Sequence, residues 1–381
     1  MAQTWNLFFT GLPSPIIRPQ GRSKGKARKL CSKQTLADDL LEWYDAHQRD
    51  LPWRAKPGEQ SDPYQVWLSE VMLQQTTVAT VKGYYQRFLD RWPDVRALAN
   101  ARQEDVLEEW AGLGYYARAR NLHACAQMIN NVHAGKFPNT ASTLKTLPGI
   151  GDYASAAIAA IAYGEPVPVI DGNVERIIAR LYEIDAPLPK GRKTILQALA
   201  PLVPRRRPGD FAQATMDLGA MICRPKNPAC GVCPMMNHCA ARQSNSQEAF
   251  PVKLVKKTKP TRRIVAFALI HDGHILLERR PETGLLGGTL GLPSTPWVAR
   301  QDFPSNKEWI EAAPVSSHWK DAPAPKRHTF THFHLDTQLK LGVTQNRANI
   351  ENCEWIALTP TLAEKLPTVF AKMLQALALK E

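Results

Sequence analysis

Four of the seven cysteines stand close together, in the pattern Cys-x6-Cys-x2-Cys-x5-Cys. Four thiolates in one short loop can surround a single metal centre, and both zinc and a cubane iron–sulfur cluster accept four cysteines. The alternative, four structural or free thiols, is disfavoured by the Cys-x2-Cys core. The other cysteines are isolated, so the spacing is not that of a secreted disulfide framework. The candidate metal ligands are Cys223, Cys230, Cys233 and Cys239.

The charge of the chain indicates a polyanionic partner. Its 381 residues include 48 Lys and Arg against 35 Asp and Glu, a formal net charge of +13. A surplus of this size is typical of proteins that bind nucleic acid, although a soluble basic protein is the plainer alternative. No stretch approaches the ~18 continuous apolar residues of a membrane helix, and the start lacks the pattern of a secretory signal. We expect a cytoplasmic protein.

The hydrophobic pattern divides the chain into regions. Residues 1–34 are basic and contain several prolines, which predicts a disordered arm. Residues 35–240 have helical periodicity and predict an all-α domain that includes the cysteine loop at 223–239. Residues 241–260 are polar and then lysine-rich, as in a linker. Over residues 261–381 the apolar period changes to two, which predicts a smaller α+β domain.

Capping and turn signals place individual elements. The pair Asp62-Pro63 predicts a helix start, with the helix continuing over residues 64–81. Asp171 predicts the cap of another helix. Asp272-Gly273 predicts a hairpin turn, and Pro367 predicts the start of a last helix that ends at about residue 379. Further helices are expected over 36–43, 105–110, 121–132 and 154–163, and strands over 264–270, 274–278 and 333–341.

A glycine turn precedes one of the expected helices. The sequence Leu-Pro-Gly-Ile-Gly spans residues 147–151 and contains Gly149 and Gly151. Two glycines let backbone N–H groups approach an anion closely, and the N-terminus of the following helix adds partial positive charge. The turn is therefore a candidate phosphate-binding element. A tight turn between two helices, with no ligand, is the alternative.

Two carboxyl groups are candidates for catalysis. Glu70 lies on an apolar helix face with Val66 and Leu73, so we expect burial to raise its pKa and make it a general acid at neutral pH. Asp171, held by backbone N–H groups at a helix start, is expected to stay ionised. Cleavage of a glycosidic bond through an oxocarbenium-like state requires such an acid and carboxylate. The alternatives are a solvated or arginine-paired glutamate and an ordinary capping aspartate.

In their order along the chain, these motifs resemble the helix-hairpin-helix superfamily of DNA glycosylases. Within it they are most similar to the adenine DNA glycosylase (MutY) family. The resemblance implies that the cysteine loop holds a [4Fe–4S] cluster rather than zinc, and that it positions Arg224 and Lys226 near phosphate. The motifs that carry it are residues 51–54 (Leu-Pro-Trp-Arg), 69–76 (Ser-Glu-Val-Met-Leu-Gln-Gln-Thr), 112–118 (Gly-Leu-Gly-Tyr-Tyr-Ala-Arg), 171–174 (Asp-Gly-Asn-Val), the glycine turn and the cysteine loop.

The resemblance also implies catalytic roles. Glu70 matches the acid that protonates the adenine ring, Asp171 matches the carboxylate that stabilises the sugar cation, and Asn173 matches a residue that supports them. In relatives of endonuclease III, a lysine that attacks the sugar stands where this chain has Tyr153. A phenol cannot form a Schiff base, so base excision without efficient strand cleavage is expected. Tyr153 would assist in an adenine-specific site, although a packed tyrosine is the alternative.

Further residues match positions that contact DNA. Gln75 and Tyr115 match residues that enter the DNA stack around the mismatch, and the glycine turn matches the hairpin that grips one phosphate without reading sequence. Trp53 and Arg54 match residues of the base pocket. The alternatives are an ordinary buried aromatic for Trp53 and a surface arginine for Arg54. The full set in this part of the chain is Trp53, Arg54, Gln75, Tyr115, Gly149 and Gly151.

The region from residue 264 onward resembles the Nudix-like domain that recognises 8-oxoguanine in this family. The glutamate-rich helix that holds magnesium in Nudix hydrolases is missing, so nucleotide hydrolysis is not expected. The family's Phe-Ser-His loop corresponds to Phe330, Thr331 and His332, and threonine keeps the hydroxyl while adding a methyl. A strand face, or a metal site with neighbouring histidines, is the alternative for His332.

The sequence therefore predicts a monomeric glycosylase that removes adenine paired with 8-oxoguanine or guanine in double-stranded DNA. The adenine would be flipped out of the duplex to reach Glu70. One alternative is an endonuclease III-type glycosylase and lyase acting on oxidised pyrimidines, against which Tyr153 and the second domain argue. The other is a non-catalytic iron–sulfur DNA-binding protein, in which Glu70 and Asp171 would be structural.

Overall fold

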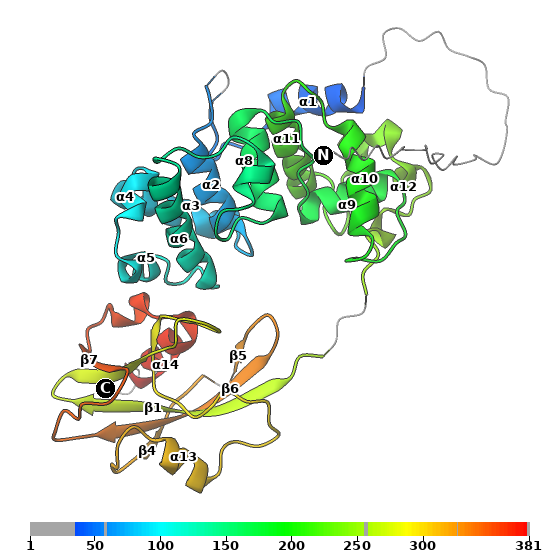
Figure 1. Ribbon diagram of the computed structural model, residues 1–381. Helices are drawn as coiled ribbons and strands as arrows, with labels where there is room; N and C mark the ends of the chain where they lie inside the picture. Colours follow the sequence, from blue (N-terminus) through cyan, green and yellow to red (C-terminus); the bar gives the residue numbers. More distant parts are fainter. Residues whose placement is uncertain (1–34, 57–58, 255–257, 326, 379–381) are drawn as a thin grey trace, which may run out of the picture. The chain divides into compact units, whose positions relative to one another are not determined.

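The computed structural model describes residues 35–378, except for residues 57, 58, 255–257 and 326. The arm expected at residues 1–34 lies outside the described residues. The described chain is helical up to residue 254, which we call the helical region, and its strands lie in residues 258–378, the sheet region (Figure 1). None of the described helices combines the length and the hydropathy that crossing a bilayer requires.

Side-chain caps begin several helices of the helical region. Asp62, Thr77, Asp94, Thr140 and Asp171 each accept a hydrogen bond from a backbone N–H in the first turn that follows. The helices expected over 36–43, 105–110, 121–132 and 154–163 are confirmed as α1, α5, α6 and α8. The full set is α1 (Leu36–His47), α2 (Pro63–Leu73), α3 (Val78–Arg91), α4 (Val95–Ala99), α5 (Gln103–Glu109), α6 (Ala117–Val132), α7 (Ala141–Leu144), α8 (Asp152–Tyr163), α9 (Gly172–Leu181), α10 (Arg192–Leu199), α11 (Pro208–Met221) and α12 (Ala240–Gln243).

The single helix expected over residues 64–81 is wrong. Asp62 caps α2 as expected, accepting a hydrogen bond from the Tyr64 N–H at 2.8 Å, but α2 ends at Leu73 and α3 begins at Val78. Gln75 has a φ angle of +61°, a left-handed conformation that interrupts a helix. Thr77 then caps α3. The interruption leaves Gln75 exposed just beyond the end of α2.

Helix α8 packs against both α2 and α11. Its buried face is formed largely by alanines, and a Cβ on Gly209 of α11 would lie 2.6 Å from the carbonyl oxygen of Ala160. The backbones of α8 and α11 are therefore in direct contact. Because its side chains are small, α8 brings residues of α2 and α11 to the same side of the helical region.

The sheet region contains one mixed sheet among its described residues, with strand order β3-β2-β1-β6-β4, β5 beside β6 and β7 beside β2. β1 is parallel to β6 and antiparallel to β2. The expected hairpin is confirmed, because Ile270 pairs with Ile275 and both turn residues have positive φ angles. The strands are β1 (Thr261–His271), β2 (His274–Arg279), β3 (Leu290–Gly291), β4 (Lys320–Ala322), β5 (His328–Thr329), β6 (His334–Val343) and β7 (Cys353–Ala357).

Helices cover the two faces of this sheet (Figure 1). Ala266 and Ala268 of β1 share a core with Phe370 of α14 (Thr368–Ala378). Phe267, which points to the opposite face, lies 6.4 Å from Trp309 of α13 (Asn306–Ala312), measured between ring centroids. The last helix, α14, begins directly after Pro367, as expected.

The segment interpreted as a linker, residues 241–260, contains most of α12 and a 3-10 turn at Gln247–Ala249.

The glycine turn offers a test of local strain. Gly149 has a φ angle of +73°, and a Cβ there would lie 2.6 Å from the Cβ of Asn121, whereas a Cβ on Gly151 would meet no atom within 4 Å. We predict that Gly149→Ala lowers the free energy of unfolding by about 1–2 kcal/mol. Its matched control, Gly151→Ala, should change it by less than about 0.5 kcal/mol. Urea unfolding followed by circular dichroism measures both, and equal losses would contradict the assignment of the strain to Gly149.

Candidate active site

A cavity of about 590 Å³ opens in the helical region. It is lined by residues of α2, α8, the start of α9, α11 and the loops that follow α1 and α2. Seven of the residues singled out in the sequence reach it. They are Trp53, Arg54, Glu70, Gln75, Tyr153, Asp171 and Asn173.

Glu70 is the buried acid of this cavity. Its side chain is on α2, the residue is 6% exposed, and Oε2 accepts a hydrogen bond of 2.5 Å from the hydroxyl of Tyr153. Burial raises the pKa of Glu70 to about 7, and the negative charge of Asp171 also raises it, while the Tyr153 hydrogen bond and Arg54 lower it. The expected direction of the shift is confirmed. At neutral pH, Glu70 can therefore hold a proton that it is able to donate.

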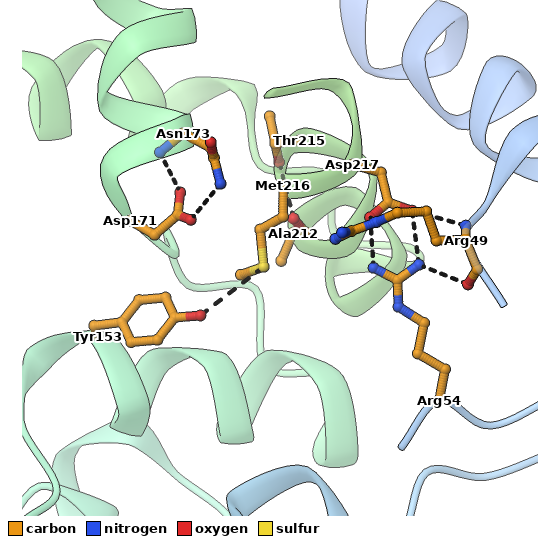
Figure 2. A network of polar contacts seen from close by, with 9 residues as sticks. All are labelled: Arg49, Arg54, Tyr153, Asp171, Asn173, Ala212, Thr215, Met216 and Asp217. Atoms are coloured by element: carbon orange, nitrogen blue, oxygen red, sulfur yellow. Dashed lines mark hydrogen bonds and ion pairs between the residues drawn. The ribbon is translucent and has the colours of Figure 1, made fainter. Parts of the chain in front are cut away.

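Asp171 faces the same cavity from the start of α9, where it is the N-cap residue. Its Oδ1 accepts a hydrogen bond from the Asn173 N–H at 2.9 Å, and its Oδ2 accepts one from Asn173 Nδ2 at 3.0 Å (Figure 2). Oδ1 also accepts one from the Val174 N–H at 2.8 Å. All three partners are donors, so they stabilise a negative charge on the carboxylate. The expected cap is confirmed. The same geometry orients the carboxylate at the cavity.

Tyr153 belongs to the first turn of α8 and points its hydroxyl into the cavity (Figure 2). Besides the bond to Glu70, this hydroxyl lies 3.9 Å from Met216 Sδ on α11. Burial, with the charges of Glu70 and Asp171, raises the pKa of Tyr153 well above its ordinary value. The side chain is therefore a neutral phenol, whose hydroxyl donates its proton to the hydrogen bond with Glu70.

Sequence reasoning missed Arg49, which lines the cavity, and Asp217, which lies behind the lining residue Arg54. Asp217 of α11 is fully buried. Its carboxylate accepts hydrogen bonds from Arg54 Nη1 and Nη2, each at 2.7 Å, and from Arg49 Nε at 2.6 Å (Figure 2). Arg54 is thus a buried residue of the cavity, not a surface arginine. An aspartate within the apolar run of residues 211–222 was the only local signal, and nothing in the sequence indicated its partners, more than 160 positions earlier.

The remaining candidate residues of the helical region have different surroundings. Trp53 is 7% exposed and packs edge-on against Tyr85, with 5.4 Å between ring centroids. Gln75 is exposed at the cavity, after the end of α2. Tyr115 does not line the cavity; it lies just before α6 and is 46% exposed, with a φ angle of +50°. Gly149 and Gly151 form the turn that leads into α8 and do not line the cavity either.

The three candidate residues of the sheet region follow β5. The ring of Phe330 stacks on Phe333 with 4.7 Å between centroids and lies 4.6 Å from the ring of His328. Thr331 and His332 are exposed at the turn between β5 and β6. Phe330 is thereby anchored to the sheet, while the next two residues are exposed.

The four candidate cysteines line a separate small cavity of about 30 Å³ and form no disulfide. A zinc ion holds four sulfurs at about 2.3 Å, yet no three His, Cys, Asp or Glu side chains of the described residues are placed to hold a single ion. A cubane cluster spreads its cysteines around a larger body. Four cysteines around one cavity are the ligand set of such a cluster, which these thiolates would hold.

Two buried arginines of α9 connect this loop to the cavity. Arg180 donates to Cys223 Sγ at 3.3 Å and to the carbonyl oxygen of Arg224 at 2.7 Å. Arg176 donates through Nε to the carbonyl oxygen of Cys223 at 2.7 Å and through Nη2 to Asn173 Oδ1 at 2.9 Å. Because Asn173 also donates to Asp171, a continuous chain of contacts joins the cysteine loop to the Asp171 carboxylate. The loop's own Arg224 and Lys226 are exposed.

Family models match three parts of the chain. Residues 68–202 match the HhH-GPD superfamily of base excision DNA repair proteins, and residues 223–239 match the iron–sulfur binding domain of endonuclease III. Residues 265–376 match the NUDIX domain. These matches confirm the expected fold class, an all-α helix-hairpin-helix domain followed by an α+β Nudix-like domain. They also confirm the cofactor, a [4Fe–4S] cluster on the cysteine loop.

Curated proteins similar to this chain are adenine DNA glycosylases. The one from Homo sapiens is 36% identical over 370 residues, covering 82% of this chain and 67% of its own length. One from Buchnera aphidicola subsp. Acyrthosiphon pisum is 33% identical, covering 80% of this chain and 85% of its own length. The one from Arabidopsis thaliana is 40% identical over 301 residues, and the chain spans about half of that relative, 47% of its length.

The raised pKa of Glu70 predicts a pH-dependent penalty on folding. Unfolded, the carboxyl loses its proton near 4.5; folded, it does so near 7, so the wild type loses stability as the pH rises through this window. Glu70→Gln has no proton to lose. We predict that the free energy of unfolding of Glu70→Gln, relative to that of the wild type, rises by about 2–3 kcal/mol between pH 5 and pH 8. Urea unfolding at both pH values measures this, with the exposed Glu104→Gln as control, and an equal pH dependence in Glu70→Gln and wild type would refute it.

Proposed function

The chain belongs to the adenine DNA glycosylase family, and on that premise we propose that it hydrolyses the N-glycosidic bond of adenine in double-stranded DNA. The adenine is the one paired with 8-oxoguanine or with guanine. The observation that carries the proposal is the pair of carboxyl groups in one cavity: Glu70, buried and with a pKa of about 7, and Asp171, held by three N–H donors.

The roles of these residues follow from their protonation. Glu70 holds a proton at neutral pH and donates it to the adenine ring, which makes the base a better leaving group. Asp171 offers a negative charge to the oxocarbenium-like sugar that remains. Asn173 fixes the orientation of Asp171 through its bond to Oδ2, and Tyr153 fixes Glu70. Water completes the hydrolysis.

Binding of the duplex is assigned to residues around the cavity. An adenine within a duplex is stacked, so it must be flipped out to reach Glu70. Gln75 and Tyr115 are exposed and enter the DNA stack around the mismatch, and Trp53 and Arg54 form the wall of the base pocket. Gly149 and Gly151 offer the start of α8 to a phosphate. Phe330, Thr331 and His332 recognise the base that is left opposite.

The organisation of the whole protein is part of the proposal. We assign residues 35–240 to the glycosylase domain, 241–260 to a linker and 261–381 to the Nudix-like domain. The enzyme would act as a monomer. Free thiols and a DNA substrate suit a cytoplasmic, nucleoid-associated protein. The [4Fe–4S] cluster would hold the cysteine loop in shape, and no step of the reaction is assigned to it.

Two other functions fit the structure less well. A lyase of the endonuclease III type needs an amine at the cavity, and no lysine is among the described residues that line it. A non-catalytic DNA-binding protein would have no use for a buried, protonated carboxyl beside a second carboxylate, an arrangement that burdens folding. Both alternatives give distinct results in the experiment that tests the proposal.

That experiment is single-turnover excision on a labelled duplex with adenine opposite 8-oxoguanine. We predict that wild type gives strand breaks only after alkali, and that Glu70→Gln, which cannot donate a proton, is slower by a factor of about 10² or more. A parallel duplex with adenine opposite guanine tests the second mispair. Breaks without alkali would indicate a lyase. Tight binding with no excision by either protein would leave a lesion-binding module.

The hydrogen bond from Tyr153 predicts a shift in the pH profile. It lowers the pKa of Glu70, so its removal in Tyr153→Phe should raise that pKa above about 7. The rate falls when Glu70 loses its proton, and the alkaline limb of the excision rate should move upward by up to about one pH unit. Tyr163→Phe, which removes another hydroxyl of α8, is the control. An unmoved or lowered limb in Tyr153→Phe would show that the bond does not tune Glu70.

A further inference from the structure

Arg118 is a charged side chain that binds mainly backbone carbonyl oxygens. It lies in the first turn of α6, where a positive charge opposes the helix dipole, and that turn carries no acidic residue. Among the described residues its hydrogen bonds go to four carbonyl oxygens and one hydroxyl, and its Nε is buried without a partner. Burial lowers the pKa of Arg118 to about 10. Its position therefore serves something other than α6 itself.

The two ends of the guanidinium bind two different segments. Nη1 donates to the carbonyl oxygens of Val71 and Met72 at 2.9 and 3.0 Å. These belong to the last turn of α2, where carbonyl groups lack helical partners and a cation is favoured. Nη2 donates to the carbonyl oxygens of Leu113 and Gly114 at 3.0 and 3.2 Å. Arg118 thus caps the helix that carries Glu70 and also holds the turn before α6.

Each of these segments leads directly into a strained residue. Gln75 follows the end of α2 with a φ angle of +61°, and Tyr115 follows Gly114 with a φ angle of +50°. Left-handed backbone is unfavourable for such residues and persists only where neighbouring contacts impose it. Arg118 supplies such contacts, since it also reaches Thr76 Oγ1 at 3.3 Å and lies over the Tyr115 ring, 5.6 Å from its centroid.

We propose that Arg118 is a positioning residue that fixes the Gln75 segment and the Tyr115 segment relative to one another. The inference rests on the proposed function, in which both side chains enter the DNA stack. Only a forked guanidinium can reach both segments at once, whereas a lysine ammonium is a single point charge. Arg118 touches neither the adenine nor the reacting sugar; it acts through the residues that deform the duplex.

The test compares Arg118→Met and Arg118→Lys with wild type in single-turnover excision of adenine opposite 8-oxoguanine. Arg118→Met should be slower by about ten- to hundredfold, because misplaced residues lose the productive geometry. Arg118→Lys should recover little of this loss. With 2-aminopurine in place of the target adenine, the fluorescence rise on flipping should fall in both variants. The alkaline limb of the rate should stay in place, because Glu70 is untouched.

Arg96→Met is the matched control. Arg96 also donates to a loop carbonyl oxygen in strained backbone, that of Ala134 at 3.0 Å, where φ is +53°, but this loop follows α6 and contains neither Gln75 nor Tyr115. The Arg96→Met variant should keep the excision rate and the 2-aminopurine fluorescence rise within about twofold of wild type. A loss in Arg96→Met as large as in Arg118→Met would mean that any such arginine matters through stability alone, and would overturn the proposal.

A double-mutant cycle decides whether Arg118 acts through the two residues. In a Gln75→Ala, Tyr115→Ala background, Arg118→Met should slow excision by less than about twofold, because the groups it positions are already gone. The same factor in both backgrounds would overturn the proposal, as would full recovery by Arg118→Lys. A wild type without excision activity would instead refute the proposed function, so the two failures are distinguishable.

Discussion

The helical region depends on keeping one carboxyl group, that of Glu70, away from water. Burial of a carboxyl is unfavourable unless it is protonated or paired, and the surrounding helices provide for both states. α2 presents Glu70, and α8 presents the Tyr153 hydroxyl that bonds to it at 2.5 Å. α8 can come this close because its buried residues are mostly alanine and α11 offers Gly209 at the contact. The small side chains of α8 thus allow the hydrogen bond between Tyr153 and Glu70.

The start of α9 serves structure and chemistry with the same atoms. The N–H groups that Asp171 caps are the donors that hold its carboxylate at the cavity. Asn173 extends this arrangement to Arg176, and Arg176 extends it to the backbone of Cys223. The cysteine loop is therefore anchored to the helix that begins at Asp171. A polar network of this kind is stable only when all of its members are present.

Features encoded by neighbouring residues could be predicted from the sequence. The caps at Asp62 and Asp171, the hairpin at Asp272 and the apolar setting of Glu70 each depend on a few adjacent positions, and the structure has them all. The end of α2 could not be predicted, because the left-handed Gln75 is held from α6. Nor could Asp217, whose partners Arg49 and Arg54 are distant in sequence. Long-range contacts decide what local propensity leaves open.

The charges around Glu70 explain why burial controls its pKa. Arg54 lowers the pKa of Glu70, and as an unpaired cation beside the cavity it would draw the proton from Glu70 more strongly. The fully buried carboxylate of Asp217 forms ion pairs with both Arg54 and Arg49. Asp171 adds a further negative charge on the other side. The opposing charges offset one another, so desolvation remains the largest influence and leaves Glu70 with a pKa near neutrality, where a group can both hold and release a proton.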